Sequence, residues 1–219
     1  MNGLAPHTEK IFEKLSLLDC LKDYVLMGGT ALALQLKHRL SEDLDFCCWH
    51  KSKYEPLKVN WYEIQQQLIT IGNTKVTLIE NKQCDFIVEG VRITFFADNK
   101  FKQPQNLKKI KYLNNIYLVD VETIGVLKME VMLRRDVFRD FYDMYAILKS
   151  GISLETILLR TGKYIRHNIR TRDMISTLLN ADIQIVDKKF SDLQPVYNVT
   201  FEEIKMFFTE KAKELVLRK

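Results

Sequence analysis

The chain has 219 residues, of which 47% are hydrophobic and 28% are charged, and its formal net charge is +5. This composition is that of a folded globular protein and excludes long disordered linkers, while the small positive charge suits an anionic partner without identifying one. The longest uncharged apolar stretch is shorter than the ~20 residues that a membrane helix requires. With four cysteines that lack zinc-ligand spacing and with no secretory signal, we expect a reduced, cytoplasmic protein without membrane contact.

The N-terminal half alternates helical and strand-like patterns. In chain order, we expect a helix at 8–21, a strand at 24–27, a helix at 30–38, a strand at 44–49, a helix at 54–71, and strands at 75–80, 85–88, 91–96 and 116–119. The strands at 85–88 and 91–96 are expected to form a hairpin through Glu89-Gly90. Residues 101–115, which are rich in lysine and contain Pro104, are expected to be irregular.

From Asp120 onward the pattern is helical. Asp120 is a suitable N-cap, and helical periodicity then continues without a break to Ser150-Gly151. Further helices follow, with breaks near Gly162, at 187–191 and at Pro195. We therefore predict an α/β (α+β) fold, in which a mixed-sheet domain flanked by helices occupies residues 1–119 and a helical bundle occupies residues 120–219.

A glycine pair marks the first candidate site. Gly28 and Gly29 follow a buried strand and precede a helix expected to start at Thr30. Glycines allow the backbone to approach a ligand closely, and a helix N-terminus directs N–H groups and partial positive charge towards phosphate. The Thr30 hydroxyl is expected either to cap this helix or to contact a phosphate oxygen.

Two acidic residues form the second part of the site. Asp43 and Asp45 are two positions apart, so on an extended strand both side chains would leave the same face. Carboxylates held together repel one another unless a cation lies between them, and Mg²⁺ prefers oxygen ligands together with substrate phosphates. Arg39 and Ser41 lie just upstream, and Arg39 could contact phosphate or hold the carboxylates in place. The sequence therefore predicts a metal and nucleotide site.

These residues resemble a known family. The segment from Gly28-Gly29-Thr30 to Asp43-Leu-Asp45-Phe is similar to the first motif of the abortive-infection toxin nucleotidyltransferases of the AbiEii/AbiGii type, within the polymerase-β-like superfamily. The segment from Asp120 to Lys128, followed by Arg135, Asp140 and Asp143, resembles that family's lysine and (Lys/Arg)-Asp-x-x-Asp helix. Residues 90–96 resemble its central strand, and the resemblance covers roughly residues 24–149.

The resemblance implies an enzyme that transfers a nucleoside monophosphate from an NTP to an acceptor hydroxyl, with the 3′ end of a tRNA as the acceptor. It implies a toxin of a toxin–antitoxin or phage-defence system, a cognate antitoxin, and one or two Mg²⁺ ions. The implied site residues are Asp43 and Asp45 for metal, Gly28, Gly29 and Thr30 for triphosphate, Lys128 for phosphate charge, and Asp140 or Asp143 to complete the site. The superfamily often places a third carboxylate on a neighbouring strand, where this chain has Thr94 and Phe96, with Asp98 just past the end.

Several alternatives remain open from the residues alone. Lys128, Arg135, Arg139 and Asp143 would share one stripe of a helix, facing either the site or solvent. Two basic segments could follow an RNA backbone or could be solvated faces, namely Arg160, Lys163, Arg166 and Arg170, and Lys100, Lys102, Lys108, Lys109 and Lys111. The alternative functions are a non-catalytic NTP- or RNA-binding module and a protein-interaction scaffold of the same fold.

Overall fold

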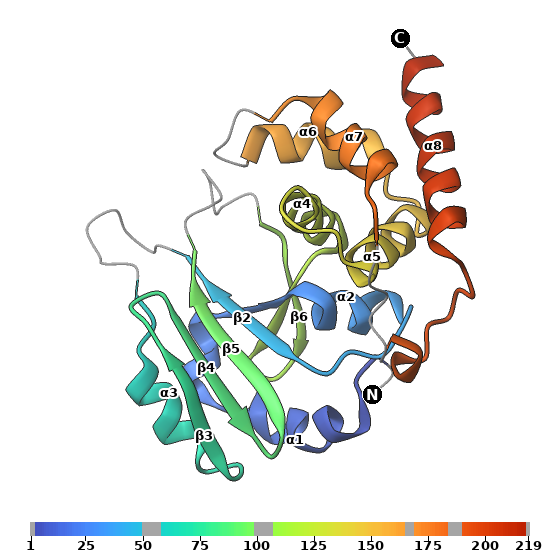
Figure 1. Cartoon of the computed structure of the whole chain (residues 1–219). Coiled ribbons are helices and arrows are strands. Elements are labelled where there is room, and N and C mark those ends of the chain that lie inside the picture. The colour runs from blue at the N-terminus through green and yellow to red at the C-terminus, as the bar shows by residue number, and fades with distance from the viewer. Residues whose placement is uncertain (1–2, 50–57, 99–106, 165–168, 184–189, 218–219) are drawn as a thin grey trace.

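The N-terminal half of the chain builds a mixed β-sheet, and the C-terminal half lies over one end of it as a group of helices (Figure 1). The computed structural model describes residues 3–49, 58–98, 107–164, 169–183 and 190–217. The N-terminus lies beside the sheet, and the C-terminal helix extends away from it. The expectation of an α/β fold that is followed by helices is confirmed.

The described elements mix helices and strands up to residue 119 and are helical from residue 121 onward. They are α1 (Pro6–Ser16), η1 (Asp19–Asp23), β1 (Val25–Met27), α2 (Gly28–Leu36), β2 (Leu44–Cys48), α3 (Trp61–Leu68), β3 (Thr74–Ile79), β4 (Gln83–Val88), β5 (Val91–Ala97), β6 (Lys109–Leu113), β7 (Ile116–Val119), α4 (Val121–Met132), α5 (Phe138–Lys149), α6 (Leu154–Tyr164), α7 (Thr171–Asn180), η3 (Phe190–Leu193) and α8 (Phe201–Leu217).

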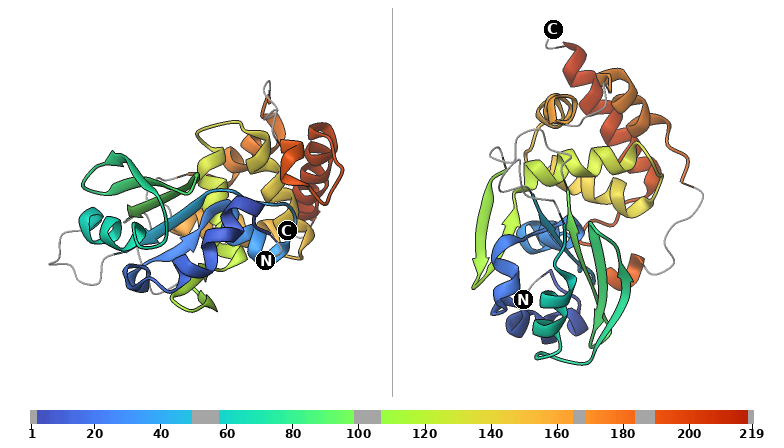
Figure 2. Two further views of the ribbon diagram at one scale, coloured as in Figure 1. Left: turned by 90° about the horizontal axis from the view of Figure 1, so that it is seen from below. Right: turned by 90° about the vertical axis from the view of Figure 1, so that its left-hand side faces the viewer.

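The described strands form one seven-stranded sheet in the order β3-β4-β5-β2-β1-β7-β6. The pairs β2–β5 and β1–β7 are parallel, and the other neighbouring pairs are antiparallel. Helix α3 packs on β3 at one edge, while α2 touches β1, β2, α4 and α5 and so joins the sheet to the helices. The two views of Figure 2 show this division into a sheet part and a helical part.

Strand register decides which side chains share a face of the sheet. Asp45 of β2 pairs with Thr94 of β5, which in turn pairs with Asp85 of β4. Because paired residues point to the same side, these three side chains line one face. Their neighbours Phe46 and Phe95 point to the opposite face, where the two rings stack at 5.2 Å in the core. The sheet thus places a polar row on the face towards α4.

Local signals in the sequence account for several boundaries. Asp120 accepts a hydrogen bond from the Thr123 N–H at 3.1 Å and caps α4 as expected. Glu89 and Gly90 have positive φ angles of 49° and 82°, which suit a two-residue hairpin turn between β4 and β5. Gly28 begins α2 with φ at +69°, so this helix starts at the glycine pair and not at Thr30.

Besides the start of α2, four expected segments differ from the structure. The helix predicted over 120–150 is two helices, since residues 133–137 are not helical. These residues include no Gly or Pro, so the sequence contains no signal for the break. The segment expected to be irregular contains β6, which pairs with β7 across a turn at Asn114-Asn115. The first helix ends at Ser16, and α3 is shorter than the range 54–71, whose residues 54–57 lie outside the described part of the chain.

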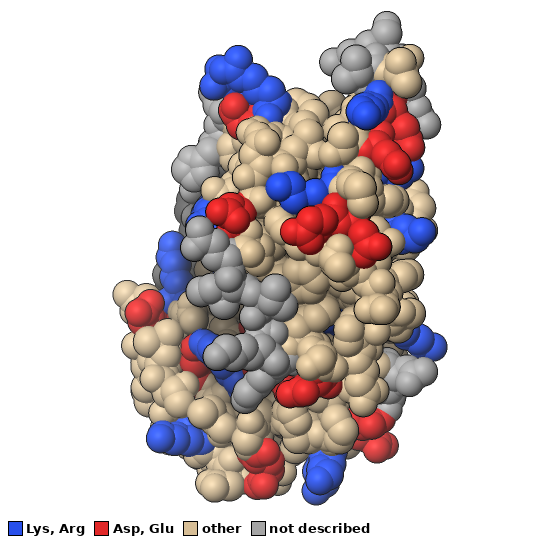
Figure 3. Space-filling view, turned by 45° about the vertical axis from the view of Figure 1, so that its right-hand side comes forward, with Lys and Arg blue, Asp and Glu red and all other residues tan. Residues whose placement is uncertain are grey.

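The outer surface carries both signs of charge. On the face drawn in Figure 3, acidic and basic side chains are interspersed and are not gathered into one block. Among the described residues, no helix combines the length and the apolar composition needed to cross a membrane.

Candidate nucleotide-binding and catalytic site

The glycine turn lies directly against one of the two predicted acids. A Cβ atom added to Gly28 would lie 3.0 Å from Asp45 Oδ2, and the positive φ of Gly28 would strain any other residue. The first turn of α2 carries no acidic side chain of its own, so the anionic group nearest to Gly28 comes from Asp45 of β2. The structure therefore brings the helix N-terminus and the carboxylate together.

Asp43 and Asp45 converge on one cavity. They line a space of about 330 Å³ together with Gly29 and Lys128. Asp43 is exposed and precedes β2, so it is not on the strand as predicted, whereas Asp45 is half-buried within the strand. Burial, and then the nearby charge of Asp43, raise the pKa of Asp45 from 3.8 to about 6.

This pair of carboxylates suits a magnesium ion that is bound together with a nucleotide. The described residues contain no group of three or more His, Cys, Asp or Glu side chains that could hold a metal ion. Mg²⁺ commonly takes one or two carboxylates from the protein and completes its shell with water and substrate phosphates. Asp43 and Asp45 therefore fit a metal that arrives with its nucleotide, and they do not form a site made entirely of protein ligands.

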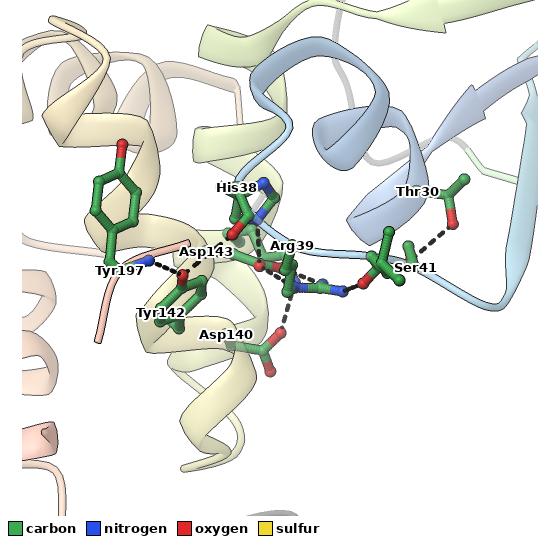
Figure 4. A network of polar contacts seen from close by, with 10 residues as sticks. Thr30, His38, Arg39, Ser41, Asp140, Tyr142, Asp143 and Tyr197 are labelled. Carbon is green, nitrogen blue, oxygen red and sulfur yellow. Dashed lines mark hydrogen bonds and ion pairs between the residues drawn. The ribbon is translucent and has the colours of Figure 1, made fainter. Parts of the chain in front are cut away.

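Thr30 and Ser41 fix the backbone beside Asp43. The Thr30 side chain is buried, and its hydroxyl lies 2.8 Å from Ser41 Oγ and in contact with the Asp43 carbonyl oxygen (Figure 4). The expected capping role of Thr30 is wrong, since Met27 is the N-cap and no side chain caps α2. Both hydroxyl residues line the 330 Å³ cavity and tie α2 to the segment that leads into β2.

Lys128 bridges two acids of the following helix. Its Nζ lies 2.7 Å from Asp140 Oδ1 and 2.7 Å from Asp143 Oδ2. In one continuous helix, Lys128 and Asp140 would be about 18 Å apart. The break between α4 and α5 is what folds these side chains together, so the predicted single stripe through Lys128, Arg135, Arg139 and Asp143 is wrong.

Asp143 is the centre of a buried ion-pair network that joins the two halves of the molecule (Figure 4). Arg39 contacts it through two nitrogens, Nε at 2.7 Å and Nη2 at 2.9 Å, and His38 Nε2 lies 2.8 Å away. Burial alone would raise the pKa of Asp143, but Arg39, Lys128 and the hydrogen bond from His38 hold it well below its usual value. Both acids are buried, but Asp140 lines the two cavities of this site and Asp143 lines neither of them.

Arg39 connects this network to the glycine turn. Its guanidinium pairs with Asp143. It does not pair with Asp43 or Asp45, although the sequence had left that alternative open. A Cβ atom on Gly29 would lie only 2.7 Å from Arg39 Nη2. The absence of a side chain at Gly29 thus lets the buried guanidinium lie against the first turn of α2.

A second cavity of about 520 Å³ adjoins the first. The two cavities share Gly29, Asp45, Lys128, Arg135 and Asp140 in their walls. The larger one adds apolar side chains from both halves of the molecule, namely Phe96, Ile124, Leu127 and Val131. Ligand pockets commonly combine such apolar walls with a few polar groups, so the pair of cavities can accept a phosphate chain beside an apolar ring system.

Sequence reasoning missed Asp85 as a member of this region, and it named Arg135 in the second motif and in a helical stripe that could face the site. Arg135 lines both cavities, is largely exposed, and donates from Nε to Asp140 Oδ2 at 2.9 Å. Asp85 lies one strand beyond Thr94 on the face of Asp45 and pairs with Arg92 at 2.6 Å. The predicted hairpin through Glu89-Gly90 would have given this register, because it sets residue 85 opposite residue 94.

The neighbouring strand carries no carboxylate opposite Asp45. Thr94 occupies that position, as the sequence suggested, and Phe96 and Asp98 line the larger cavity.

The two basic segments that the sequence offered as RNA-binding candidates are partly explained by other contacts. Arg160 donates to Glu122 at 2.6 Å and to Thr123 Oγ1 at 2.9 Å, while Lys108, Lys109 and Lys111 are exposed. Lys100, Lys102 and Arg166 lie outside the described residues.

Comparison with solved structures identifies the fold. The fold matches MenT4, a nucleotidyltransferase toxin from Mycobacterium tuberculosis H37Rv, with a TM-score of 0.59 at 16% identity, over 92% of this chain and 82% of that one. It also matches a candidate nucleotidyltransferase from H. pylori with a TM-score of 0.54 at 16% identity, over 99% of each chain. The fold is therefore that of a nucleotidyltransferase.

The sequence then defines the family. Residues 10–210 match the family described as nucleotidyl transferase AbiEii toxin, Type IV TA system. The chain belongs to this AbiEii family of nucleotidyltransferase toxins and is a nucleotidyltransferase. An uncharacterized protein of Aquifex aeolicus (strain VF5) is 24% identical over 218 residues, which are 98% of each chain.

Proposed function

We propose that the chain is a Mg²⁺-dependent toxin that transfers a nucleoside monophosphate from an NTP to the terminal hydroxyl of an RNA, with the 3′ end of a tRNA as the expected acceptor. The observation that carries this proposal is the contact between the glycine turn and Asp45, with Lys128 lining the same cavity. Its expected partners are an NTP, an RNA and a cognate antitoxin.

The triphosphate is assigned to the smaller cavity. The N-terminus of α2 offers N–H groups to phosphate oxygens, and Lys128 and Arg135 add positive charge. Asp43 and Asp45 would hold Mg²⁺, which supplies Lewis-acid polarisation of the phosphates when it is bound. The base and ribose are assigned to the larger cavity, against Phe96 and Leu127.

The reaction follows from this placement. The acceptor oxygen forms a bond to the α-phosphorus and releases its proton to water, while the bond between the α-phosphorus and the bridging oxygen breaks and pyrophosphate leaves. Lys128 and the α2 N-terminus stabilise the charge on the departing phosphates. Asp143 keeps Lys128 and Arg39 in place through the buried network.

Labelled transfer tests the proposal. The protein is incubated with each α-³²P-labelled NTP, Mg²⁺ and total tRNA, in parallel with Asp43→Ala and with a sample containing EDTA. Transfer of label to RNA by the unmodified chain that is lost in both controls supports the proposal. Mg²⁺-dependent NTP binding without transfer would favour a non-catalytic NTP-binding module, and the absence of both binding and transfer would contradict the whole assignment.

A further inference from the structure

A third hollow opens next to the proposed site. It has a volume of about 500 Å³ and lies between the α4–α5 connection and one face of α7. We name it the α7 groove, and its walls include Arg134, Arg135, Asp136, Ser176, Thr177 and Asn180. Arg135 also lines both cavities of the proposed site, so the α7 groove adjoins that site and shares one wall residue with it.

The chemistry of the α7 groove is that of a hydrogen-bonding surface. Most of its wall is polar, and Ser176 and Asn180 stand on the same face of α7, where Asn180 Nδ2 donates to Ser176 Oγ at 2.9 Å. The side chains of Arg134 and Arg135 are 56% and 59% exposed, so their outer nitrogens are accessible from the groove. Asp136 is the only acid among the wall residues of this groove.

These groups favour a nucleic acid over a protein as the occupant. Arginine together with Ser, Thr and Asn side chains makes most protein contacts to phosphate and sugar groups. A protein acceptor would instead call for a buried apolar or aromatic anchor pocket, which the polar wall does not offer. The exposed Arg170 and Arg172 at the start of α7 share one carboxylate partner, Asp173, so this end of the same helix keeps an excess of positive charge.

We propose that the α7 groove binds the acceptor RNA strand and leads its terminal hydroxyl past Arg135 to Asp43 and Asp45. This inference rests on the proposed function and deepens it, because it gives the acceptor an entry route separate from the nucleotide cavities. Arg135 would then lie where the phosphates of the donor and of the acceptor meet.

A carboxylate placed in the groove tests the inference. Ser176→Glu puts a negative charge on the groove face of α7, and Gln66→Glu adds the same group to the exposed side of α3, which packs on the far edge of the sheet. We expect Ser176→Glu to raise the KM for total tRNA about fivefold to tenfold by repelling phosphate, and Gln66→Glu to leave it unchanged. The KM for NTP and kcat at saturating tRNA should be unchanged in both variants.

Three other outcomes are possible, and each one supports or overturns RNA binding in the α7 groove. Equal KM values for tRNA in the two variants would overturn the α7 groove while the proposed function stood. If the unmodified chain transferred no label, the proposed function would fail, and direct binding of tRNA would decide the groove: weaker binding by Ser176→Glu supports it, and equal binding overturns it. Label found on a protein acceptor and lost only in Ser176→Glu would show that the occupant is a protein.

Discussion

Lys128 Nζ lies 2.7 Å from Asp143 Oδ2, although the two residues are on different helices. The same carboxylate also holds Arg39, which comes from the segment between α2 and β2. This contact therefore fixes the position of Lys128, the lysine proposed to bind phosphate, relative to the glycine turn, and it links the helical part of the molecule to the sheet.

Removal of the charge at this junction should destabilise the fold. Asp143→Asn leaves the buried guanidinium of Arg39 without a full ion pair, and breaking a buried pair in this way costs roughly 3–5 kcal/mol. Urea unfolding monitored by circular dichroism measures the loss. Asp173→Asn is the matched control, because it removes an exposed partner of Arg170 and should leave stability unchanged. Equal stability of the two variants would contradict the role given to Asp143.

Gly29 should tolerate no side chain. In Gly29→Ala, the added methyl group would lie 2.7 Å from Arg39 Nη2, which Asp143 holds in place, so we expect a loss of about 1–3 kcal/mol from overpacking and a higher KM for NTP. Urea unfolding and NTP titration measure both effects.

Gly162→Ala serves as the control for Gly29→Ala. Gly162 is exposed in α6, and the nearest atom to an added Cβ is 3.9 Å away, so alanine should be neutral or stabilising by up to about 1 kcal/mol. If both alanine variants behaved alike, close packing at the glycine turn would not be the reason for Gly29.

Arg135 should contribute to nucleotide affinity more than to stability. Arg135→Gln removes one charge-assisted phosphate contact of about 1.5–3 kcal/mol, so the KM for NTP should rise at least about tenfold. Because its side chain is 59% exposed and Lys128 still pairs with Asp140, unfolding free energy should change by less than about 1 kcal/mol. Lys22→Gln, an exposed cation paired with Asp19, is the control. An unchanged KM for NTP in Arg135→Gln would remove Arg135 from the site.

His38 should make the fold sensitive to mild acid. Burial lowers the pKa of His38 below 6.5, and the contact with Asp143 only partly opposes this. The folded state therefore resists protonation, so the stability that His38 contributes is present above about pH 6.5 and is lost as the pH falls. Unfolding free energies measured from pH 7.5 to 5 should decline more steeply for the unmodified chain than for His38→Gln. Parallel curves would contradict this assignment.

The sequence predicted those features that depend on neighbouring residues. The glycine turn, the Asp120 cap and the hairpin at Glu89-Gly90 are each encoded by local backbone chemistry, and the structure contains all three. The sequence also predicted that Asp43 and Asp45 lie near the glycine turn. Only a short helix and the start of one strand separate these acids from the turn, so the chain between them has little conformational freedom.

The remaining features depend on contacts between distant residues. The break after α4 has no Gly or Pro signal and comes from the packing of α5 against α2 and α4, so the Lys128–Asp140 contact could not be read from periodicity. The same limit applies to Arg39 and Asp143, which are 104 positions apart. Of the two roles expected for Thr30, capping the helix or contacting phosphate, the cap is wrong: Thr30 contacts Ser41, because α2 begins two residues earlier than predicted.

The central claim is that Asp45 at the glycine turn carries the transfer of a nucleotide, and one comparison tests it most directly. Transfer of α-³²P label from NTP to tRNA with Mg²⁺ is measured for the unmodified chain, for Asp45→Asn and for Glu42→Gln, an exposed neighbour that lines neither cavity. We predict that Asp45→Asn folds normally but loses more than about 100-fold in rate, since even residues that only support metal ligands contribute 10- to 100-fold. Glu42→Gln should remain fully active. Full activity in Asp45→Asn would contradict the role of Asp45 in nucleotide transfer.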